Sequence, residues 1–111
     1  MAHKLETIQK RSTFLKIKEK GKFYKSDSFN LIILEDISLN KATFFGFTAT
    51  KKLGSAIIRN KAKRIMRELA RKIILECCKK NYYYVLIAKS SILKKKHSSL
   101  EIEIKKLISK C

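Results

Sequence analysis

The sequence contains no proline, no tryptophan, only three glycines and only nine acidic residues among 111. Without proline or a glycine-rich stretch there is no obvious linker, so we expect a single domain over residues 1–111. The longest uninterrupted apolar run covers residues 82–88, far short of the ~18 residues that a membrane-spanning helix needs. The first ten residues also lack the apolar stretch of a secretory signal. These absences favour a cytoplasmic protein.

Metal-binding and catalytic side chains are equally scarce. The three cysteines are odd in number and include no CxxC motif, so we expect reduced thiols rather than disulfides or a zinc site. His3 and His97 are far apart, with no partner at metal-ligand spacing. Adjacent carboxylates, which two-metal nuclease chemistry needs, occur only at Glu35 and Asp36. The sequence therefore predicts no catalytic residues and no tightly bound metal.

Positive charge is what the sequence has in excess. It carries 27 Lys and Arg residues against nine acids, a net charge of +18. A small domain with this charge repels itself, and we expect an anionic partner to neutralise it. The hydrophobic fraction of 45% is ordinary for a folded protein, so the charge belongs to a globular domain. Nucleic acid is the first candidate partner and a membrane surface the second.

Hydrophobic periodicity predicts the element order α-β-β-α-β-α, an α/β two-layer sandwich. Residues 1–11 are basic and weakly patterned, which indicates a flexible arm. The predicted elements are a helix from Ser12 or Thr13 to Gly21, strands at 28–35, 42–50 and 82–89, a helix at 55–78, and a final helix capped by Ser98 with Glu101.

The faces of the first two predicted strands differ in character. Residues 28–35 are apolar on both faces, which is typical of a strand that is central or covered. In residues 42–50, one face is small and hydroxylated, with Gly46, Thr48 and Thr50. We expect another part of the structure or a ligand to approach this face closely.

The helix predicted at 55–78 separates an apolar face from a basic one. Ser55 is a plausible N-cap, and apolar residues recur from Ile58 to Cys77 with the period of a core-facing helix. The basic residues form an i+4 ladder with one neighbour, namely Arg59, Lys63, Arg67 and Arg71 with Arg64 beside them. At ~100° per residue, these five and Asn60 cover an arc of roughly 140°.

This basic face is typical of phosphate binding. Residues 51–72 contain nine Lys or Arg residues and one Glu, a net charge of +8. Solvated helix faces normally mix signs, and like charges at i,i+4 destabilise a helix by ~0.2–0.5 kcal/mol per pair. Arginine suits phosphate because its planar fork holds two oxygens. Lys51 and Lys52 precede the helix N-terminus, where a further phosphate would be favoured.

The run from Gly46 to Leu69 resembles the signature of the bacterial ribonuclease P protein family. That signature is a strand, then Lys-Lys-x-Gly-x-Ala, then Arg-Asn-Arg with a basic ladder. The matching residues are Lys51, Lys52, Gly54, Ala56, Arg59, Asn60, Lys63, Arg64 and Arg67, and Lys61 stands where the family has its second arginine. The remaining elements also follow the family's order along essentially the whole chain.

The resemblance implies an accessory, non-catalytic protein subunit of an endoribonuclease. Ribonuclease P removes the 5′ leader from precursor tRNA, and its catalysis belongs to an RNA subunit with bound Mg²⁺. One protein per RNA is expected, and no cofactor is expected on the protein itself. The family fold implies a mixed sheet in which the connection through the basic helix is left-handed, an exception to a strong rule.

The resemblance also implies two binding surfaces. The expected RNA-subunit contacts are Lys51, Lys52, Arg59, Asn60, Lys61, Lys63, Arg64, Arg67 and Arg71. A cleft between the first helix and the sheet would hold the 5′ leader, with Phe14, Phe29, Leu31 and Thr48 as candidates. Ordinary core packing is the alternative role for Phe14 and Phe29.

Three other functions compete with this interpretation. A ribosomal or other structural-RNA-binding protein would be equally basic but would not prefer a 5′ leader. A DNA-binding helix would need exposed base-reading side chains, and only Asn60 qualifies on the basic helix. A membrane-surface helix is disfavoured, because the apolar face of residues 58–77 is needed for the core.

Overall fold

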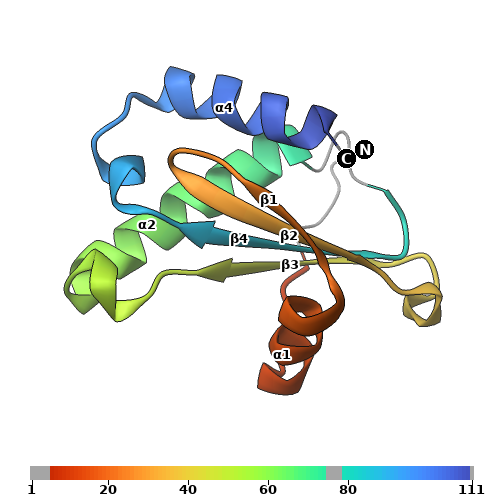
Figure 1. The fold of residues 1–111 in the computed structure, drawn as a ribbon. Coiled ribbons are helices and arrows are strands. Elements are labelled where there is room, and N and C mark those ends of the chain that lie inside the picture. Colours follow the sequence, from red (N-terminus) through yellow and green to blue (C-terminus); the bar gives the residue numbers. More distant parts are fainter. Residues whose placement is uncertain (1–5, 75–78, 111) are drawn as a thin grey trace.

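The computed structural model describes residues 6–74 and 79–110. Its elements, labelled as in Figure 1, are α1 (Arg11–Lys20), β1 (Lys22–Lys25), β2 (Phe29–Glu35), η1 (Ile37–Leu39), β3 (Thr43–Thr48), η2 (Lys51–Leu53), α2 (Ala56–Leu69), the π-helical turn η3 (Ala70–Ile74), β4 (Tyr82–Ala88), η4 (Ser90–Leu93) and α4 (His97–Ser109).

The four strands form one mixed sheet in the order β1-β2-β4-β3. β2 pairs antiparallel with both β1 and β4, whereas β3 and β4 are parallel neighbours. The chain crosses from β3 to β4 through α2, so the predicted mixed α/β sheet is confirmed. The left hand of that crossover stays a prediction.

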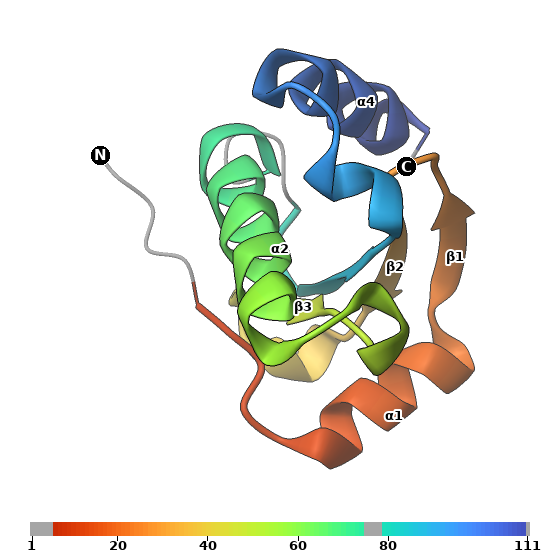
Figure 2. The same ribbon diagram turned by 90° about the vertical axis from the view of Figure 1, so that its left-hand side faces the viewer.

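The helices cover the two faces of the sheet unequally. α2 and α4 lie on one face, and α1 lies alone on the other (Figures 1 and 2). The larger core fills the space between the sheet and α2 and α4, and it includes Phe45, Met66 and Leu100. A smaller cluster under α1 contains Ile17, Ile32 and Val85. The face under α1 is therefore only partly covered.

β2 is the central strand that its two apolar faces predicted. It lies between β1 and β4, and its side chains alternate between the two cores. Phe29, Leu31 and Ile33 enter the larger core, whereas Ile32 enters the cluster under α1.

The sequence analysis missed β1. This strand has four residues and is mostly exposed, so it carries no long hydrophobic alternation. It is recruited by the hairpin with β2, in which Lys22 pairs with Ile33 and Lys25 with Asn30. Its addition makes the observed order α-β-β-β-α-β-α.

Glu103 of α4 holds the turn of this hairpin. Its carboxylate accepts hydrogen bonds from the hydroxyl of Ser26 at 2.5 Å, the backbone N–H of Ser28 at 2.6 Å and the Nζ of Lys95 at 2.8 Å. Burial raises the pKa of Glu103, but these hydrogen bonds outweigh it and lower the pKa to about 2. The turn and α4 are thereby joined through one ionised side chain.

Two predicted helix starts are wrong. α1 begins at Arg11 with Lys10 as its N-cap residue, and neither Ser12 nor Thr13 caps it through a side chain. α4 begins at His97, before Ser98, and Glu101 instead pairs with Lys72 of η3, with 2.8 Å between Oε1 and Nζ. A partner on another helix has replaced the local capping box.

The other predicted helix boundaries agree in part. α1 ends at Lys20, and Gly21 is its C-cap, as predicted, with its N–H donating to the Ile17 carbonyl. α2 starts at the predicted N-cap Ser55, whose hydroxyl accepts a hydrogen bond from Ile58. It ends at Leu69 and continues as η3 to Ile74. The predicted continuation to residue 78, including Cys77, lies outside the described residues.

The predicted flexible arm is wrong for residues 6–8. The N–H of Phe45 donates to the Glu6 carbonyl at 2.8 Å, and the N–H of Ile8 donates to the Phe45 carbonyl at 2.9 Å. This short parallel pairing lies along the free edge of β3. Residues 1–5 of the predicted arm lie outside the described residues.

Candidate nucleic-acid interface

The turn before α2 places two lysines at the helix N-terminus. Gly54 has a φ of 146°, which side chains rarely tolerate, so glycine permits the change of direction from η2 into α2. Lys51 and Lys52 of η2 are both exposed beside this N-terminus. The positive end of the helix and two ammonium groups therefore face solvent together.

The outward side of α2 presents the predicted phosphate ligands. Ala62, Met66 and Leu69 are fully buried against the sheet and turn the opposite side of the helix to solvent. Arg59 and Lys63 are half-buried at the border of this side. The exposed members of the predicted set are Asn60, Lys61, Arg64 and Arg67 on α2, and Arg71 on η3.

None of these cations is neutralised within the described ranges. The four ion pairs found there involve Lys16, Lys72 and Lys95, not the predicted phosphate ligands. Glu68, the acid within this stretch, takes part in none of them. The structure therefore brings Lys51, Lys52, the basic residues of α2 and Arg71 of η3 together on one surface that no carboxylate of the described residues neutralises, which we call the basic face.

The basic face extends toward the sheet. The guanidinium of Arg67 lies 5.8 Å from the centroid of the Phe47 ring on β3, in a cation–π contact. The Nε of Arg59 is buried and has no hydrogen-bond partner. A desolvated N–H of this kind is costly unless a ligand accepts its hydrogen bond.

The sheet face beside α1 differs from the prediction at two positions. Phe29 and Leu31 are both 0% exposed and belong to the larger core, on the side of α2 and α4. They point away from α1 and cannot line a cleft beside it. Their proposed contact with a 5′ leader is therefore wrong, and core packing is their role.

Phe14 and Thr48 do lie on the α1 side. Phe14 is half-buried and packs so closely on Gly46 that a Cβ there would lie 2.5 Å from the Phe14 Cε1. This confirms the close approach that the small face of the strand predicted. Thr48 follows two residues later and therefore points to the same side.

Sheet pairing reveals a row of residues that the sequence analysis missed. Thr48 pairs with Ile87, Ile87 with Asn30, and Asn30 with Lys25, so one row crosses all four strands. Ile87 belongs to the cluster under α1, which places the row on that face. We call Lys25, Asn30, Ile87 and Thr48 the cross-strand row. The alternation in residues 28–35 already put Asn30 opposite Phe29, but only the packing of α1 on the sheet shows which side faces α1.

An ion pair ties α1 to the loop that follows β2. The Nζ of Lys16 lies 3.0 Å from Oδ2 of Asp36, in the loop after β2. Hydrogen bonds from the Ser38 hydroxyl and from Lys16 lower the pKa of Asp36 to about 2. The carboxylate therefore stays ionised and keeps α1 anchored over most of the pH range.

The described residues contain no group of three or more His, Cys, Asp and Glu side chains placed to hold a metal ion. None of the helices in the same ranges combines the length and apolarity that crossing a bilayer requires. The fold, the basic face and the partly covered sheet define an α/β protein with a strongly cationic surface.

Comparisons with known proteins identify the family. The family model described as Ribonuclease P matches residues 2–111. A ribonuclease P protein component from Syntrophus aciditrophicus is 32% identical over 108 residues, covering 96% of this chain and 87% of that protein. One from Clostridium acetobutylicum is 28% identical, covering 93% of this chain and 86% of that protein. The chain belongs to the ribonuclease P protein family.

Solved structures share the fold. The ribonuclease P protein from Thermotoga maritima superposes with a TM-score of 0.81 at 22% identity, covering 96% of this chain and 97% of that one. The Staphylococcus aureus protein gives a TM-score of 0.79 at 22% identity, covering 96% of this chain and 94% of that one. The sequence-based recognition and the mixed α/β architecture are thus both confirmed.

Proposed function

We propose that this chain is the protein subunit that assists ribonuclease P RNA in removing the 5′ leader from precursor tRNA in the cytoplasm. The observation that carries this proposal is the basic face, whose cations have no carboxylate partner in the described part of a chain of this family. Uncompensated cations at i,i+4 spacing cost helix stability, and phosphates would remove that cost.

The basic face would bind the RNA subunit through its phosphates. Arginine forks on the exposed side of α2 suit bidentate contacts, and the α2 N-terminus with Lys51 and Lys52 suits a further phosphate. The proposed contacts are Lys51, Lys52, Arg59, Asn60, Lys61, Lys63, Arg64, Arg67 and Arg71. A single such face per chain favours one protein per RNA.

The α1 side of the sheet would hold the single-stranded leader. Phe14 of α1 offers an aromatic ring at this face, and stacking of a base on an aromatic ring is worth ~1–3 kcal/mol. The cross-strand row adds an amide at Asn30 and a cation at Lys25. Its other end, Thr48, comes three residues before Lys51, so a strand leaving this face would meet the cations of η2.

The protein would act by binding rather than by chemistry. Mg²⁺ held by the RNA subunit would supply the activated water and stabilise the leaving oxygen. The described residues offer no carboxylate cluster for such an ion. Their cations would instead offset repulsion between the phosphates of two RNAs, which lowers the free Mg²⁺ that the complex needs.

Reconstitution tests the proposal. We expect the chain, added to a bacterial ribonuclease P RNA, to restore leader removal at low Mg²⁺, where the RNA alone is slow. No gain at any Mg²⁺ concentration would contradict the subunit role. The holoenzyme should also bind precursor tRNA more tightly than mature tRNA at matched salt. Equal affinities would contradict leader binding and favour a general structural-RNA-binding protein.

A further inference from the structure

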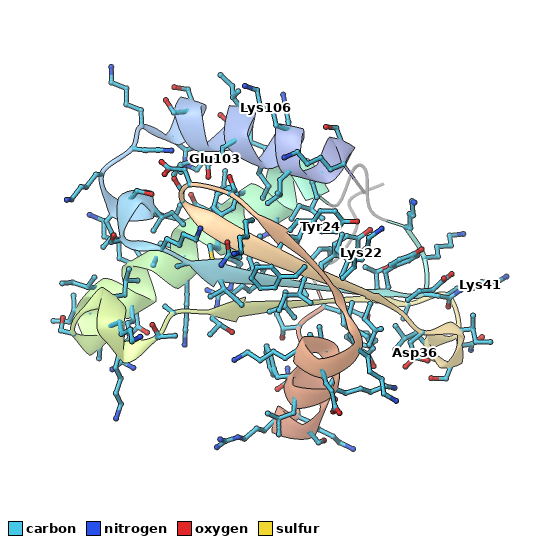
Figure 3. The ribbon with its side chains drawn as sticks, viewed as in Figure 1. Lys22, Tyr24, Asp36, Lys41, Glu103 and Lys106 are labelled. Carbon is cyan, nitrogen blue, oxygen red and sulfur yellow. The ribbon has the colours of Figure 1, made fainter. Side chains whose placement is uncertain are left out.

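A cavity is lined mainly by the sheet face opposite α1, with Lys20 at the end of α1 on its rim. This cavity of about 430 Å³ opens where the sheet extends past the cover of α4, within the ~300–1,000 Å³ range of ligand pockets. Figure 3 shows two of its lining residues, Lys22 and Tyr24, on β1 beneath the C-terminal part of α4. Its floor includes Ile33 of the larger core.

Three tyrosines form the aromatic part of this cavity. Tyr24 comes from β1, and Tyr82 and Tyr84 come from β4. The rings of Tyr82 and Tyr84 have centroids 6.1 Å apart and are tilted by 33°. The hydroxyl of Tyr84 accepts a hydrogen bond from the Lys79 N–H at 3.0 Å, which fixes the ring relative to the loop before β4. The aromatic surface is therefore held in place from two strands.

Three lysines stand at the same cavity. The Nζ of Lys22 lies 5.9 Å from the Tyr24 ring centroid, and the Nζ of Lys79 lies 5.8 Å from that of Tyr82. Lys20 is the third, and the cavity has one acid, Glu35. No ion pair in the described residues involves any of these three lysines. The cavity thus combines aromatic walls with an excess of unneutralised cations.

We propose that this cavity binds one nucleotide, with its base against the tyrosines and its phosphate near Lys20, Lys22 and Lys79. Aromatic rings beside a cationic groove are the combination that holds unpaired nucleotides without sequence preference. The nucleotide comes either from a single-stranded RNA or from the free nucleotide pool. The site is separate from the basic face and from the cross-strand row, so it does not rest on the proposed function.

Tyrosine NMR signals offer a site-resolved test on the full chain. The chain contains four tyrosines, and the fourth, Tyr83, points to the α1 side, where it packs with the cluster there. With ring-labelled tyrosine, adenosine 5′-monophosphate should produce saturable shifts of the Tyr24, Tyr82 and Tyr84 signals. A Tyr83→Phe variant assigns the remaining signal, which serves as the internal reference.

Charge-matched variants test the phosphate contact. Lys22→Ala combined with Lys79→Ala should weaken adenosine 5′-monophosphate binding roughly tenfold or more, because two charge-assisted contacts are lost. Lys94→Ala combined with Lys96→Ala is the matched control. It removes the same charge just before the N-terminus of α4, away from the cavity, and should leave the affinity within about twofold. All four lysines are exposed, so folding should survive in both variants.

A short single-stranded oligoribonucleotide distinguishes the two sources. If the oligoribonucleotide shifts the three signals at lower concentration than the mononucleotide, the ligand is a strand residue. If the mononucleotide binds at least as tightly, the ligand is the free nucleotide. The proposal is overturned if neither probe shifts the three signals, if all four signals follow one shared affinity, or if the two double variants bind equally.

Discussion

Arg67 on α2 places its guanidinium over the ring of Phe47 on β3, 5.8 Å from the ring centroid. The contact joins the basic face to the sheet and restrains an exposed guanidinium group. Because a restrained guanidinium loses less rotamer entropy on binding, Arg67 is preorganised to bind a phosphate.

Replacing Arg67 should therefore weaken binding to ribonuclease P RNA without unfolding the protein. We expect Arg67→Ala to lower the affinity and to reduce the slope of log affinity against log salt by roughly 0.7–0.9, the loss of one phosphate contact. Affinities measured over a salt series give both values. Arg64→Ala should behave similarly.

Lys106→Ala is the matched control, since this exposed lysine lies on α4, away from the basic face (Figure 3). A slope that is the same in the Arg67→Ala and Lys106→Ala variants would mean that Arg67 contacts no phosphate.

Lys61 offers a gain-of-function test. It is exposed on α2 and stands where the resembled signature has arginine. Lys61→Arg adds a planar fork at unchanged charge, so we expect a several-fold tighter complex with the RNA subunit. The same change at Lys106 should have no effect. Equal gains at both positions would point to a nonspecific effect of arginine.

Asn30 and Leu31 are neighbours on β2 that face opposite sides of the sheet, and they should separate binding from stability. Asn30→Ala should leave the free energy of unfolding nearly unchanged, since its Oδ1 has no hydrogen-bond partner to lose. It should lower the preference for precursor over mature tRNA several-fold.

Leu31→Ala should instead destabilise the fold by about 2–5 kcal/mol, because Leu31 is fully buried. Denaturant unfolding and paired tRNA affinities measure the two effects. An unchanged tRNA preference in Asn30→Ala would remove this residue from the leader surface.

The packing of Phe14 on Gly46 predicts a non-additive pair of substitutions. Gly46→Ala forces a methyl group into the Phe14 ring, and we expect it to cost about 1–3 kcal/mol of unfolding free energy. In a Phe14→Leu background the added methyl should cost clearly less, because the ring edge is gone. Denaturation curves of the parent, the two single variants and the double variant complete this double-mutant cycle. Strict additivity would show that α1 does not pack on β3 through this contact.

The Glu103 carboxylate predicts an acid-sensitive component of stability. Its pKa of about 2 lies below the value of 4.5 expected in the unfolded chain, so its contribution is complete above pH 4.5 and is lost as the pH falls through 2. The difference in unfolding free energy between the parent and Glu103→Gln should be about 3 kcal/mol near pH 6 and shrink steadily below pH 4.5.

Glu101→Gln on the same helix is the comparison variant. It removes a carboxylate that pairs with the exposed Lys72. It should cost much less unfolding free energy than Glu103→Gln, because water screens an exposed ion pair. If both substitutions cost the same at every pH, the Glu103 hydrogen bonds do not hold the hairpin turn.

Sequence reasoning succeeded where a pattern is local and long. The 3.6-residue period of α2, its Ser55 cap and its one-signed face need no tertiary information, and the structure shows all three. The double-sided apolar pattern of residues 29–35 likewise identified a central strand.

The errors share a physical cause, because each depended on partners distant in sequence. Which side of β2 faces α1 is decided by the packing of the helices on the sheet, so Phe29 and Leu31 were placed on the wrong side. β1 exists only through its pairing with β2, and Glu101 left its expected capping role for Lys72. None of these choices is encoded within a few residues of the side chain concerned.

The pairing of residues 6–8 with Phe45 has a consequence for the behaviour of the free protein. A bare outer strand can recruit a strand from another molecule and so begin aggregation. Along β3 that position is already occupied by the protein's own backbone. At the other margin, β1 is short and has exposed lysines at both ends, Lys22 and Lys25. A second copy would thus find few open hydrogen-bonding groups and a repelling charge, so concentrated protein should resist strand-to-strand association even before RNA binds.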